Sequence, residues 1–363
     1  MGSKKKSGRA ESGSRPRFRE APANIVVVGV GGGGCNAVMR MSRYRPVPGV
    51  KYICVNTDIK SLETVLQNTE DVQVLQIGER VTRGLGAGGI PEVGARAADT
   101  GRNALRKALG RADLVFLTAG MGGGTGTGAA PIVAEVAHNL GALVIAVVTT
   151  PFSFEGARRL ETAHSGLARL REKVDNLIVI HNDRLLKLFK KDLPIEEALR
   201  MADEAVMLGV LSVAELVNVP GQINVDLADV KTIMGMPGRA LMAIGEGRGP
   251  GGAVEAARQA VNNPLLDLSI EGAKGVLFNV QGGPSLTLGD VNAAGEFIAS
   301  KVSPDALIFF GMVNDPNLDD RVRITIIATG IPEDRPKPTL GPWERLSQRA
   351  PAPTFPPPGL MPN

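Results

Sequence analysis

A segment rich in glycine and threonine, GGGTGTG at Gly122–Gly128, has the composition that points most directly to chemistry. It follows a short apolar run, Ala112–Thr118, which is typical of a buried parallel strand, and it precedes an expected helix, Ala129–Leu140. Glycines allow backbone N–H groups to converge on an anion, and the first turn of a helix adds unpaired N–H donors. The hydroxyls of Thr125 and Thr127 can add two more donors. The segment therefore predicts a phosphate site.

Two further glycine segments follow expected strands of the same sheet. VGVGGGGCNAV places Gly29, Gly31 and Gly34 in G-x-G-x-x-G spacing, and Asp58 ends the next strand, which fits a dinucleotide site. The alternative is a tight turn that needs small residues. GLGAGGIPEVG contributes a third segment, Gly84–Gly89, and three such segments at one sheet edge suit a triphosphate. Because the chain contains no G-x-x-x-x-G-K-[ST], backbone amides and Mg²⁺ would have to neutralise the phosphates.

The acidic segment NVDLADV contains Asn224, Asp226 and Asp229. Spacing of i and i+3 puts the two carboxylates on one face of a helix start, where they either cap the helix or hold a water or Mg²⁺ for attack on a γ-phosphate. An expected helix, Pro194–Asn218, spans roughly 37 Å at 1.5 Å per residue and separates this segment from the glycines. We therefore expect two subunits, stacked head to tail, to complete one site.

Alternating strands and helices position these segments and predict an α/β fold with a doubly wound, mostly parallel sheet. A long central helix and a smaller α+β domain follow. The expected organisation is a basic tail at 1–20, a nucleotide-binding domain at 21–193, the central helix at 194–219, a C-terminal domain at 220–331 and a proline-rich tail at 332–363. Expected strands of the first domain are Ala23–Val30, Tyr52–Asp58, Val72–Ile77, Ala142–Thr150 and Asn176–Asp183, besides the one before Gly122.

Charge and cysteine content narrow the class of protein. The net charge of +4 comes from the first 20 residues, with seven basic and two acidic side chains, so the middle of the chain is slightly acidic and a nucleic-acid groove there is not supported. Cys35 and Cys54 lack metal-type spacing, the three histidines are scattered, and no secretory leader or apolar run of about 18 residues is present. These features predict a cytoplasmic protein without a membrane span.

The motifs together resemble the FtsZ family, the bacterial cell-division homologues of tubulin. GGGTGTG looks like the tubulin signature, and GGGGCNAV, NTD at Asn56, GLGAGGIPEVG, PFSFEG, ND at Asn182 and NVDLADV match in order from about Ala23 to Ile331. The resemblance implies a GTPase that uses Mg²⁺, polymerises head to tail into protofilaments and forms the cytokinetic ring at mid-cell. It also implies that the C-terminal tail binds membrane adaptors.

The resemblance further assigns roles to particular residues. Those expected to bind the nucleotide phosphates are Gly32, Gly33, Gly34, Cys35, Asn36, Gly123, Gly124, Thr125, Gly126, Thr127 and Gly128. Glu155 and Arg159 match contacts to ribose and phosphate, and Asn182 and Asp203 match contacts to the nucleoside. Asn224, Asp226 and Asp229 match the loop that enters the GTP site of the neighbouring subunit and activates hydrolysis.

Three positions depart from the family pattern. Leu199 stands four residues before Asp203, where a phenylalanine commonly stacks on guanine, so looser packing of the base is expected. Cys35 stands where glycine is usual and is expected to be a small buried residue rather than a nucleophile. The tail ends FPPPGLMPN and lacks the usual adaptor-binding peptide. Two other functions stay open from the residues alone: a dinucleotide-dependent oxidoreductase that uses Gly29, Gly31, Gly34 and Asp58, and a filament scaffold that binds GTP but hydrolyses it slowly.

Overall fold

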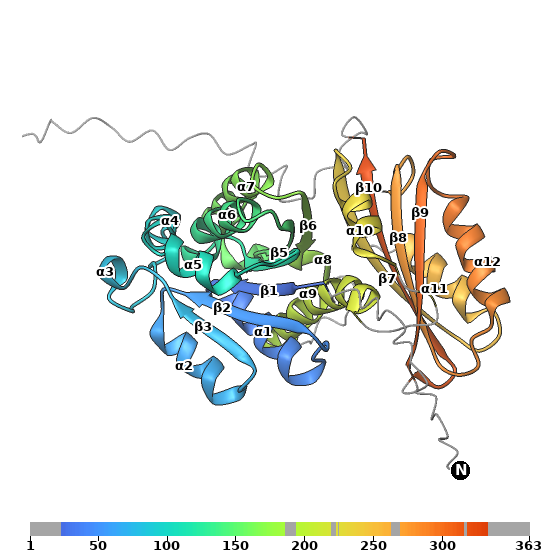
Figure 1. Cartoon of the computed structure of the whole chain (residues 1–363), viewed down its shortest axis with the longest axis horizontal. Coiled ribbons are helices and arrows are strands. Elements are labelled where there is room, and N and C mark those ends of the chain that lie inside the picture. Colours follow the sequence, from blue (N-terminus) through green and yellow to red (C-terminus); the bar gives the residue numbers. More distant parts are fainter. Residues whose placement is uncertain are drawn as a thin grey trace, which may run out of the picture.

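Six parallel strands form the sheet of the N-terminal half, in the order β3-β2-β1-β4-β5-β6 (Figure 1). The computed structural model describes residues 23–185, 194–218, 223, 225–262, 269–315 and 318–332. The strands are β1 Ile25–Val30, β2 Val50–Asn56, β3 Val72–Gln76, β4 Leu114–Gly120, β5 Leu143–Thr150 and β6 Asn176–His181. The strand order reverses between β1 and β4, and a doubly wound sheet binds its ligand at the carboxyl ends of the strands beside such a reversal.

Helices cover both faces of this sheet, which explains why its strands are apolar on both sides. Along β1, Val27 faces one core while Val26 and Val28 face the other. The helices of this half are α1 Gly31–Tyr44, α2 Ile59–Asn68, α3 Glu79–Thr82, α4 Pro91–Thr100, α5 Arg102–Leu109, α6 Thr125–His138, α7 Ala157–Arg171 and α8 Asn182–Leu185, with a 3₁₀ turn η1 at Ser153–Glu155. Helices α4 to α7 pack on one face, and α1, α2 and the long helix α9 Ile195–Asn218 pack on the other.

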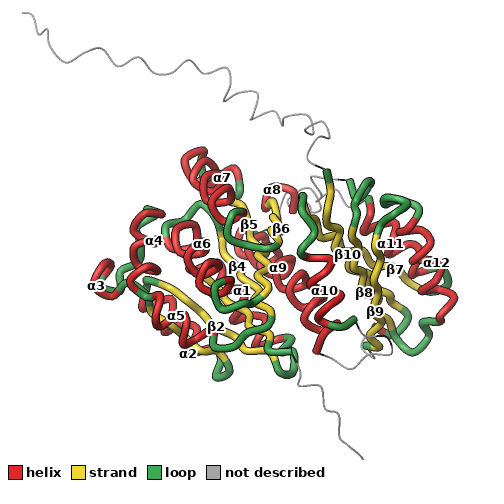
Figure 2. The backbone as a smooth tube through the Cα atoms, turned by 45° about the horizontal axis from the view of Figure 1, so that its top comes forward, coloured by secondary structure: helices red, strands yellow, loops and turns green. Residues whose placement is uncertain are grey.

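The C-terminal half is a smaller mixed sheet with the strand order β7-β10-β8-β9 (Figure 2). Strand β10 is antiparallel to both β7 and β8, while β8 and β9 are parallel. Its elements are α10 Leu227–Met234, β7 Arg239–Arg248, α11 Gly252–Val261, β8 Gly275–Gly282, α12 Leu288–Ala299, β9 Leu307–Asn314 and β10 Arg321–Ile331. Helices α11 and α12 bury a separate apolar cluster against one face of this sheet.

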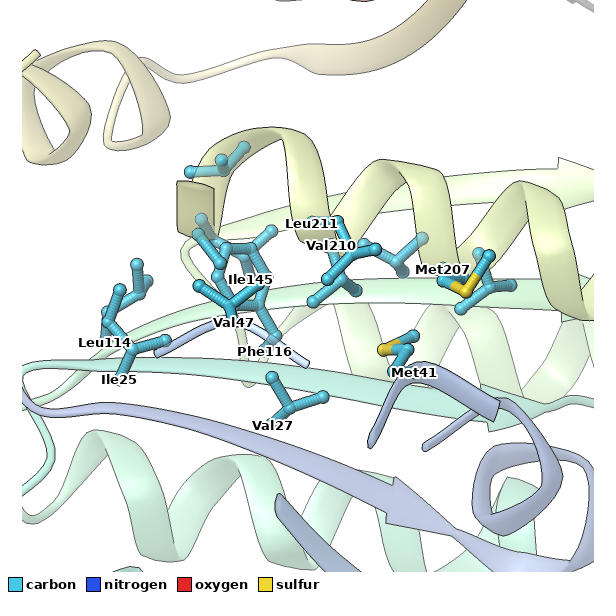
Figure 3. Packing of buried hydrophobic residues seen from close by; sticks show 14 of the residues in the cluster. Ile25, Val27, Met41, Val47, Leu114, Phe116, Ile145, Met207, Val210 and Leu211 are labelled. Carbon is cyan, nitrogen blue, oxygen red and sulfur yellow. The ribbon is translucent and has the colours of Figure 1, made fainter. Parts of the chain in front are cut away.

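Helix α9 joins the two halves through a continuous apolar core. Met207, Val210 and Leu211 of α9 belong to the same buried cluster as Phe116 and Ile145 of the first sheet (Figure 3). The cluster continues into the second sheet through other side chains, Leu277 and Ile327. Burial of a side chain of this size contributes about 1.5–3 kcal/mol, so the shared core holds the two sheets together as one unit.

Helix α9 also fixes the direction of the molecule. Its first turns lie beside α8, which follows the carboxyl end of β6. Its last residue, Asn218, donates from Nδ2 to the carbonyl of Pro48 at 3.4 Å, just before β2 begins. Helix α9 therefore runs from the carboxyl edge of the sheet to its amino edge, a length of roughly 36 Å at 1.5 Å per residue.

The predicted fold class is confirmed, but the predicted start of the helix after GGGTGTG is wrong, and the strand predicted at Asn176–Asp183 ends at His181, where α8 follows. Helix α6 begins at Thr125, not at Ala129, so the second half of GGGTGTG is the first turn of a helix rather than a loop. The reason is packing: a Cβ on Gly128 would lie 1.9 Å from the carbonyl oxygen of Pro91, so only glycine lets α6 approach α4 this closely. The predicted basic tail 1–20, residues 333–363 of the predicted proline-rich tail, and Asn224 lie outside the described residues.

Candidate functional site

Two helices begin side by side at the carboxyl edge of the sheet. Helix α1 starts at Gly31 directly after β1, and α6 starts at Thr125 shortly after β4. They touch at Gly31, whose φ is +73° and whose Cβ position would lie 2.7 Å from the backbone nitrogen of Gly126. Within the described structure neither helix start has a side-chain cap or an acidic residue in its first turn. Unpaired N–H groups from two helices thus converge, which favours an anion with several oxygens.

The glycines of the first segment divide into two kinds. A Cβ on Gly29 would lie 2.3 Å from the carbonyl oxygen of Gly34, and a Cβ on Gly34 would lie 2.3 Å from that of Thr118. These glycines, like Gly31, are required by backbone packing, and packing therefore accounts for the whole G-x-G-x-x-G spacing. Gly32 and Gly33 are exposed instead, and no described atom lies within 4 Å of the Cβ position of Gly32. The open part of the segment is where a ligand would fit.

The second segment shows the same division. Gly126 is held against the carbonyl oxygen of Gly120, 2.5 Å from its Cβ position, whereas the Cβ position of Gly123 has no described atom within 4 Å. The hydroxyl of Thr127, which is fully buried, accepts a hydrogen bond from the backbone N–H of Gly122 at 2.8 Å. That hydroxyl therefore fixes the turn before α6.

The third segment lies against the second. Gly84, Gly86, Gly88 and Gly89 all have positive φ, a conformation that glycine adopts without strain. The Cβ position of Gly124 would lie 2.8 Å from the backbone nitrogen of Ile90. Gly88 and Gly89 face open space in the described structure. The three glycine segments are thus brought together at one edge, as the sequence predicts.

Glu155 and Arg159 form an ion pair beside this edge. The two side chains approach to 2.5 Å between Oε2 and Nη1, and Oε1 of Glu155 accepts from the backbone N–H of Phe152 at 2.9 Å. Arg159 is exposed, so its guanidinium stays accessible to a phosphate while Glu155 fixes its position.

Asn182 and Asp203 lie on α8 and α9, the two elements that meet beyond β6. Asn182 is buried, and its Oδ1 has no hydrogen-bond partner among the described residues. Oδ2 of Asp203 accepts from Nε of Arg40 at 3.1 Å. Burial raises the pKa of Asp203 to about 6, although the charge of Arg40 opposes that shift. An unsatisfied buried amide oxygen and a partly desolvated carboxylate are acceptors suited to the N–H and O–H groups of a nucleoside.

Asp226 and Asp229 lie at the amino edge of the sheet, opposite the glycine segments. Oδ1 of Asp226 accepts from the backbone N–H of Asp229 at 2.8 Å, so Asp226 is the N-cap of α10. At the other end of α10, the carbonyl of Met234 accepts from Nδ2 of Asn176, the first residue of β6, at 3.3 Å. A strand of six to eight residues is roughly 20–26 Å long, so these carboxylates are far from the glycines of their own chain.

Cys35 and Asn36 are on the first turns of α1. Cys35 is fully buried, as the sequence predicts, and interaction with the neighbouring Cys54 thiol, together with burial, raises its pKa. Its side chain therefore packs behind the glycine segment instead of lining it. Asn36 is exposed on the same helix.

Three side chains at this edge were not found from the sequence. Arg40 pairs with Asp203, Oδ1 of Asp183 accepts from the backbone N–H of Ser153 at 2.7 Å, and the hydroxyl of Thr57 contacts that of Thr125 at 2.7 Å. All three act across long sequence separations, which spacing within a motif does not reveal. Thr57 lies in the motif NTD and Asp183 lies in the motif ND. These two motifs are the sequence signal by which the residues could have been found.

The described residues contain no group of three His, Cys, Asp or Glu side chains that could hold a metal ion. In the same part of the chain, no helix is long and apolar enough to cross a membrane.

Comparisons with known proteins agree with this arrangement. The model of the Tubulin/FtsZ family, GTPase domain, matches residues 24–190, and that of the FtsZ family, C-terminal domain, matches residues 238–332. The fold is similar to that of M. jannaschii FtsZ, described as an empty dimer, with 41% identity over 85% of this chain and 89% of that one and a TM-score of 0.81. It is also similar to CetZ2 from Haloferax volcanii, described as a GTPγS-bound protofilament, with 21% identity over 85% and 94% of the two chains and a TM-score of 0.71. The second likeness supports the fold alone.

Proposed function

The chain belongs to the FtsZ family of tubulin-like GTPases, and we propose that it binds GTP where α1 and α6 begin and hydrolyses it between subunits stacked head to tail. The observation that carries this proposal is the pair of adjacent helix starts, free of side-chain caps, with open glycines at Gly32 and Gly123. Such a site neutralises phosphates with backbone N–H groups, where a P-loop protein would use a lysine.

The nucleoside would lie toward α8 and α9. Asn182 supplies a buried oxygen that lacks a partner among the described residues, and Asp203 supplies a carboxylate at the next element. Ionised carboxylates only accept hydrogen bonds, so Asp203 suits the two adjacent N–H donors of guanine. Arg159, positioned by Glu155, would add positive charge near the ribose and phosphates.

The hydrolytic residues of this site would come from a second subunit. Asp226 and Asp229 of one chain lie at the opposite edge of the sheet from its own glycine segments. Stacking with the same orientation brings the amino edge of one subunit onto the carboxyl edge of the next, so the two carboxylates can orient a water toward the γ-phosphate. Asn224, which lies outside the described residues, is proposed for the same loop.

Mg²⁺ is expected with GTP, but these residues do not form a cage for it. The groups that face the open glycines are N–H donors, which do not ligate a cation. In proteins Mg²⁺ commonly keeps its waters and binds through substrate phosphates. We therefore propose only that Mg²⁺ enters on the nucleotide.

The cellular role that follows is formation of the cytokinetic ring from head-to-tail homopolymers in the cytoplasm at the division site. Membrane adaptors that bind the C-terminal tail are proposed as partners.

Replacement of Asp229 by Ala tests the shared site directly. We expect Asp229→Ala to bind GTP with unchanged affinity, because its carboxylate is remote from the glycines of its own chain, and to lose at least about tenfold in turnover. Equilibrium GTP binding and phosphate release measure the two quantities. Loss of GTP binding would remove the assignment of Asp229 to the neighbouring site, and binding of NADP in preference to GTP would favour an oxidoreductase.

A further inference from the structure

A hydrogen bond between two buried threonines links the end of β2 to the start of α6, which carries the second glycine segment. The hydroxyl oxygens of Thr57, which follows β2, and Thr125, which begins α6, lie 2.7 Å apart. Thr57 is fully buried and Thr125 nearly so. The backbone N–H of Thr57 donates to Oδ1 of Asn56 at 2.8 Å, which fixes the residue at the end of its strand. The contact therefore joins two rigid elements.

The opposite side of Thr57 holds the third glycine segment. Its carbonyl accepts from the hydroxyl of Thr82 at 3.3 Å and from the backbone N–H of Gly86 at 3.4 Å. Two residues further on, the N–H of Ile59 donates to the carbonyl of Gly84 at 3.0 Å. The first half of the third segment, Gly84–Gly86, is thus attached to Thr57 and its neighbours.

The second half of that segment is attached differently. Ala87 and Ile90 pack directly against Gly124, whose Cβ position would lie 2.8 Å from each of them. The position of the second half is therefore coupled to that of α6 by direct contact. The first half is connected to α6 through the hydrogen-bonded threonine pair, so Thr57 links the position of Gly84–Gly86 to the start of α6.

We infer that Thr57 is a positioning residue for GTP hydrolysis, which couples Gly84–Gly86 to the start of α6 through its hydroxyl. The inference rests on the proposed GTP site at α1 and α6. Thr57 is fully buried and acts through Thr125 without touching a phosphate itself. When bound nucleotide restricts the motion of the first turn of α6, the hydrogen bond between Thr57 and Thr125 also restricts the motion of Gly84–Gly86. This part of the site then takes the geometry needed for turnover.

The test compares Thr57→Val, which removes the hydroxyl at constant shape, with Thr57→Ser, which keeps it. The control is Ser42→Ala, because Ser42 makes the same kind of hydroxyl contact, 2.8 Å to Thr69, at the C-terminal end of α1 away from the glycines. Amide hydrogen exchange of Leu85 and Gly86 is measured with and without GTP, together with GTP affinity and turnover.

Thr57→Val is expected to speed exchange of Leu85 and Gly86 about tenfold in the nucleotide-free protein, the size expected for one lost hydrogen bond, and to abolish the added protection that GTP gives. Turnover should fall about tenfold and GTP affinity much less, because the N–H groups of α1 and α6 stay in place. Thr57→Ser should restore both quantities, and Ser42→Ala should change neither.

Exchange and turnover in Thr57→Val equal to those of the unmodified chain would overturn the inference. An equal effect of Ser42→Ala would overturn it too, because the cause would then be general loss of stability. If Thr57→Val does not fold, Thr82→Val removes the hydroxyl that bonds to the carbonyls of Thr57 and Gly78 and so weakens the attachment of Gly84–Gly86 to Thr57. Unchanged exchange of Leu85 and Gly86 in that variant contradicts the attachment on which the coupling depends. Failure of the unmodified chain to bind GTP is a separate result, which contradicts the proposed function and this inference with it.

Discussion

Arg40 on α1 and Asp203 on α9 are joined by a hydrogen bond of 3.1 Å that spans 163 residues of sequence. The pair connects the helix that starts at the first glycine segment to the long helix between the two sheets. Asp203 is mostly buried, and burial raises its pKa to about 6 while Arg40 lowers it again in part. The charge on this carboxylate therefore changes within the range of pH in which the protein can be assayed.

GTP binding should weaken as the pH falls through 6. Protonation of Asp203 removes an acceptor that the guanine N–H groups need, so affinity is expected to drop about tenfold for each pH unit below that value. Titration of GTP binding from pH 7.5 to 5 measures the effect. Asp203→Asn, which cannot ionise, should bind weakly with a smaller pH dependence; an identical slope in both proteins would show that Asp203 is not the titrating group.

Removal of Arg40 should move this transition to higher pH. Arg40 favours the ionised form of Asp203, so Arg40→Leu leaves only burial to act on the carboxyl and raises its pKa further. The midpoint of the pH titration of GTP binding is the measurement, with Arg43→Leu on the same helix as a control. A midpoint that stays at pH 6 in Arg40→Leu would contradict the pairing.

The Asp203 contribution to the stability of the nucleotide-free protein should increase as the pH falls, whereas GTP affinity should decrease. The folded-state pKa of Asp203 lies above its value in the unfolded chain, so the folded state binds more protons between about pH 4 and 6. The contribution of Asp203 to the free energy of unfolding therefore increases as pH falls through this window. The free energies of unfolding of the unmodified chain and of Asp203→Asn, measured with denaturant at pH 7 and pH 5, isolate this contribution. An equal difference between the two proteins at both pH values would exclude the contribution.

Glycine substitutions should separate packing from binding. Gly32→Ala and Gly123→Ala place a methyl group where no described atom lies within 4 Å, so we expect unfolding free energies within about 0.5 kcal/mol of the unmodified chain and weaker GTP binding. Gly34→Ala and Gly126→Ala place it 2.3–2.5 Å from a backbone oxygen and should destabilise the fold by about 1–3 kcal/mol or more. Thermal unfolding and GTP binding of all four variants check the division, and full GTP affinity in both open-site variants would contradict the location of the phosphates.

Leu199→Phe should strengthen GTP binding. Leu199 is 47% exposed on α9, one turn before Asp203 and on the same side of the helix. An aromatic ring there can stack on guanine, and a stacked pair contributes about 0.5–1.5 kcal/mol beyond burial, which is about two- to tenfold in affinity. Leu199→Met is the control for side-chain size alone. Equal affinities of the Phe and Met variants would show that no base stacks at this position.

Much of the fold could be predicted because local pattern and tertiary structure agree. Alternating apolar strands and helices determine the parallel sheet, and the apolar spacing of 195–218 determines α9. Strand β7 was not predicted: two glycines and two arginines stand among the residues Arg239–Arg248, and its pairing with β10 stabilises it. A local sequence pattern does not predict pairing between strands that are distant in the chain.

The site shows the same limit. The glycine segments were recognisable from composition, but composition did not reveal which glycines pack and which stay open. Gly34 and Gly126 are required by carbonyl oxygens of Thr118 and Gly120, which belong to a neighbouring strand. The start of α6 was placed four residues too late for this reason, since glycine disfavours a helix unless backbone contact demands it. The partners of Thr57 and Asp203 likewise depend on how distant elements meet.

The most direct test of the central claim, an active site built between subunits, is GTP hydrolysis per subunit as a function of protein concentration, with light scattering recorded on the same samples. We predict that hydrolysis begins only above a threshold concentration and that scattering rises at the same point, because Asp226 and Asp229 reach GTP only in a neighbouring subunit. A constant rate per subunit at all concentrations, without scattering, would contradict the account and require a catalytic group within the chain that binds the nucleotide.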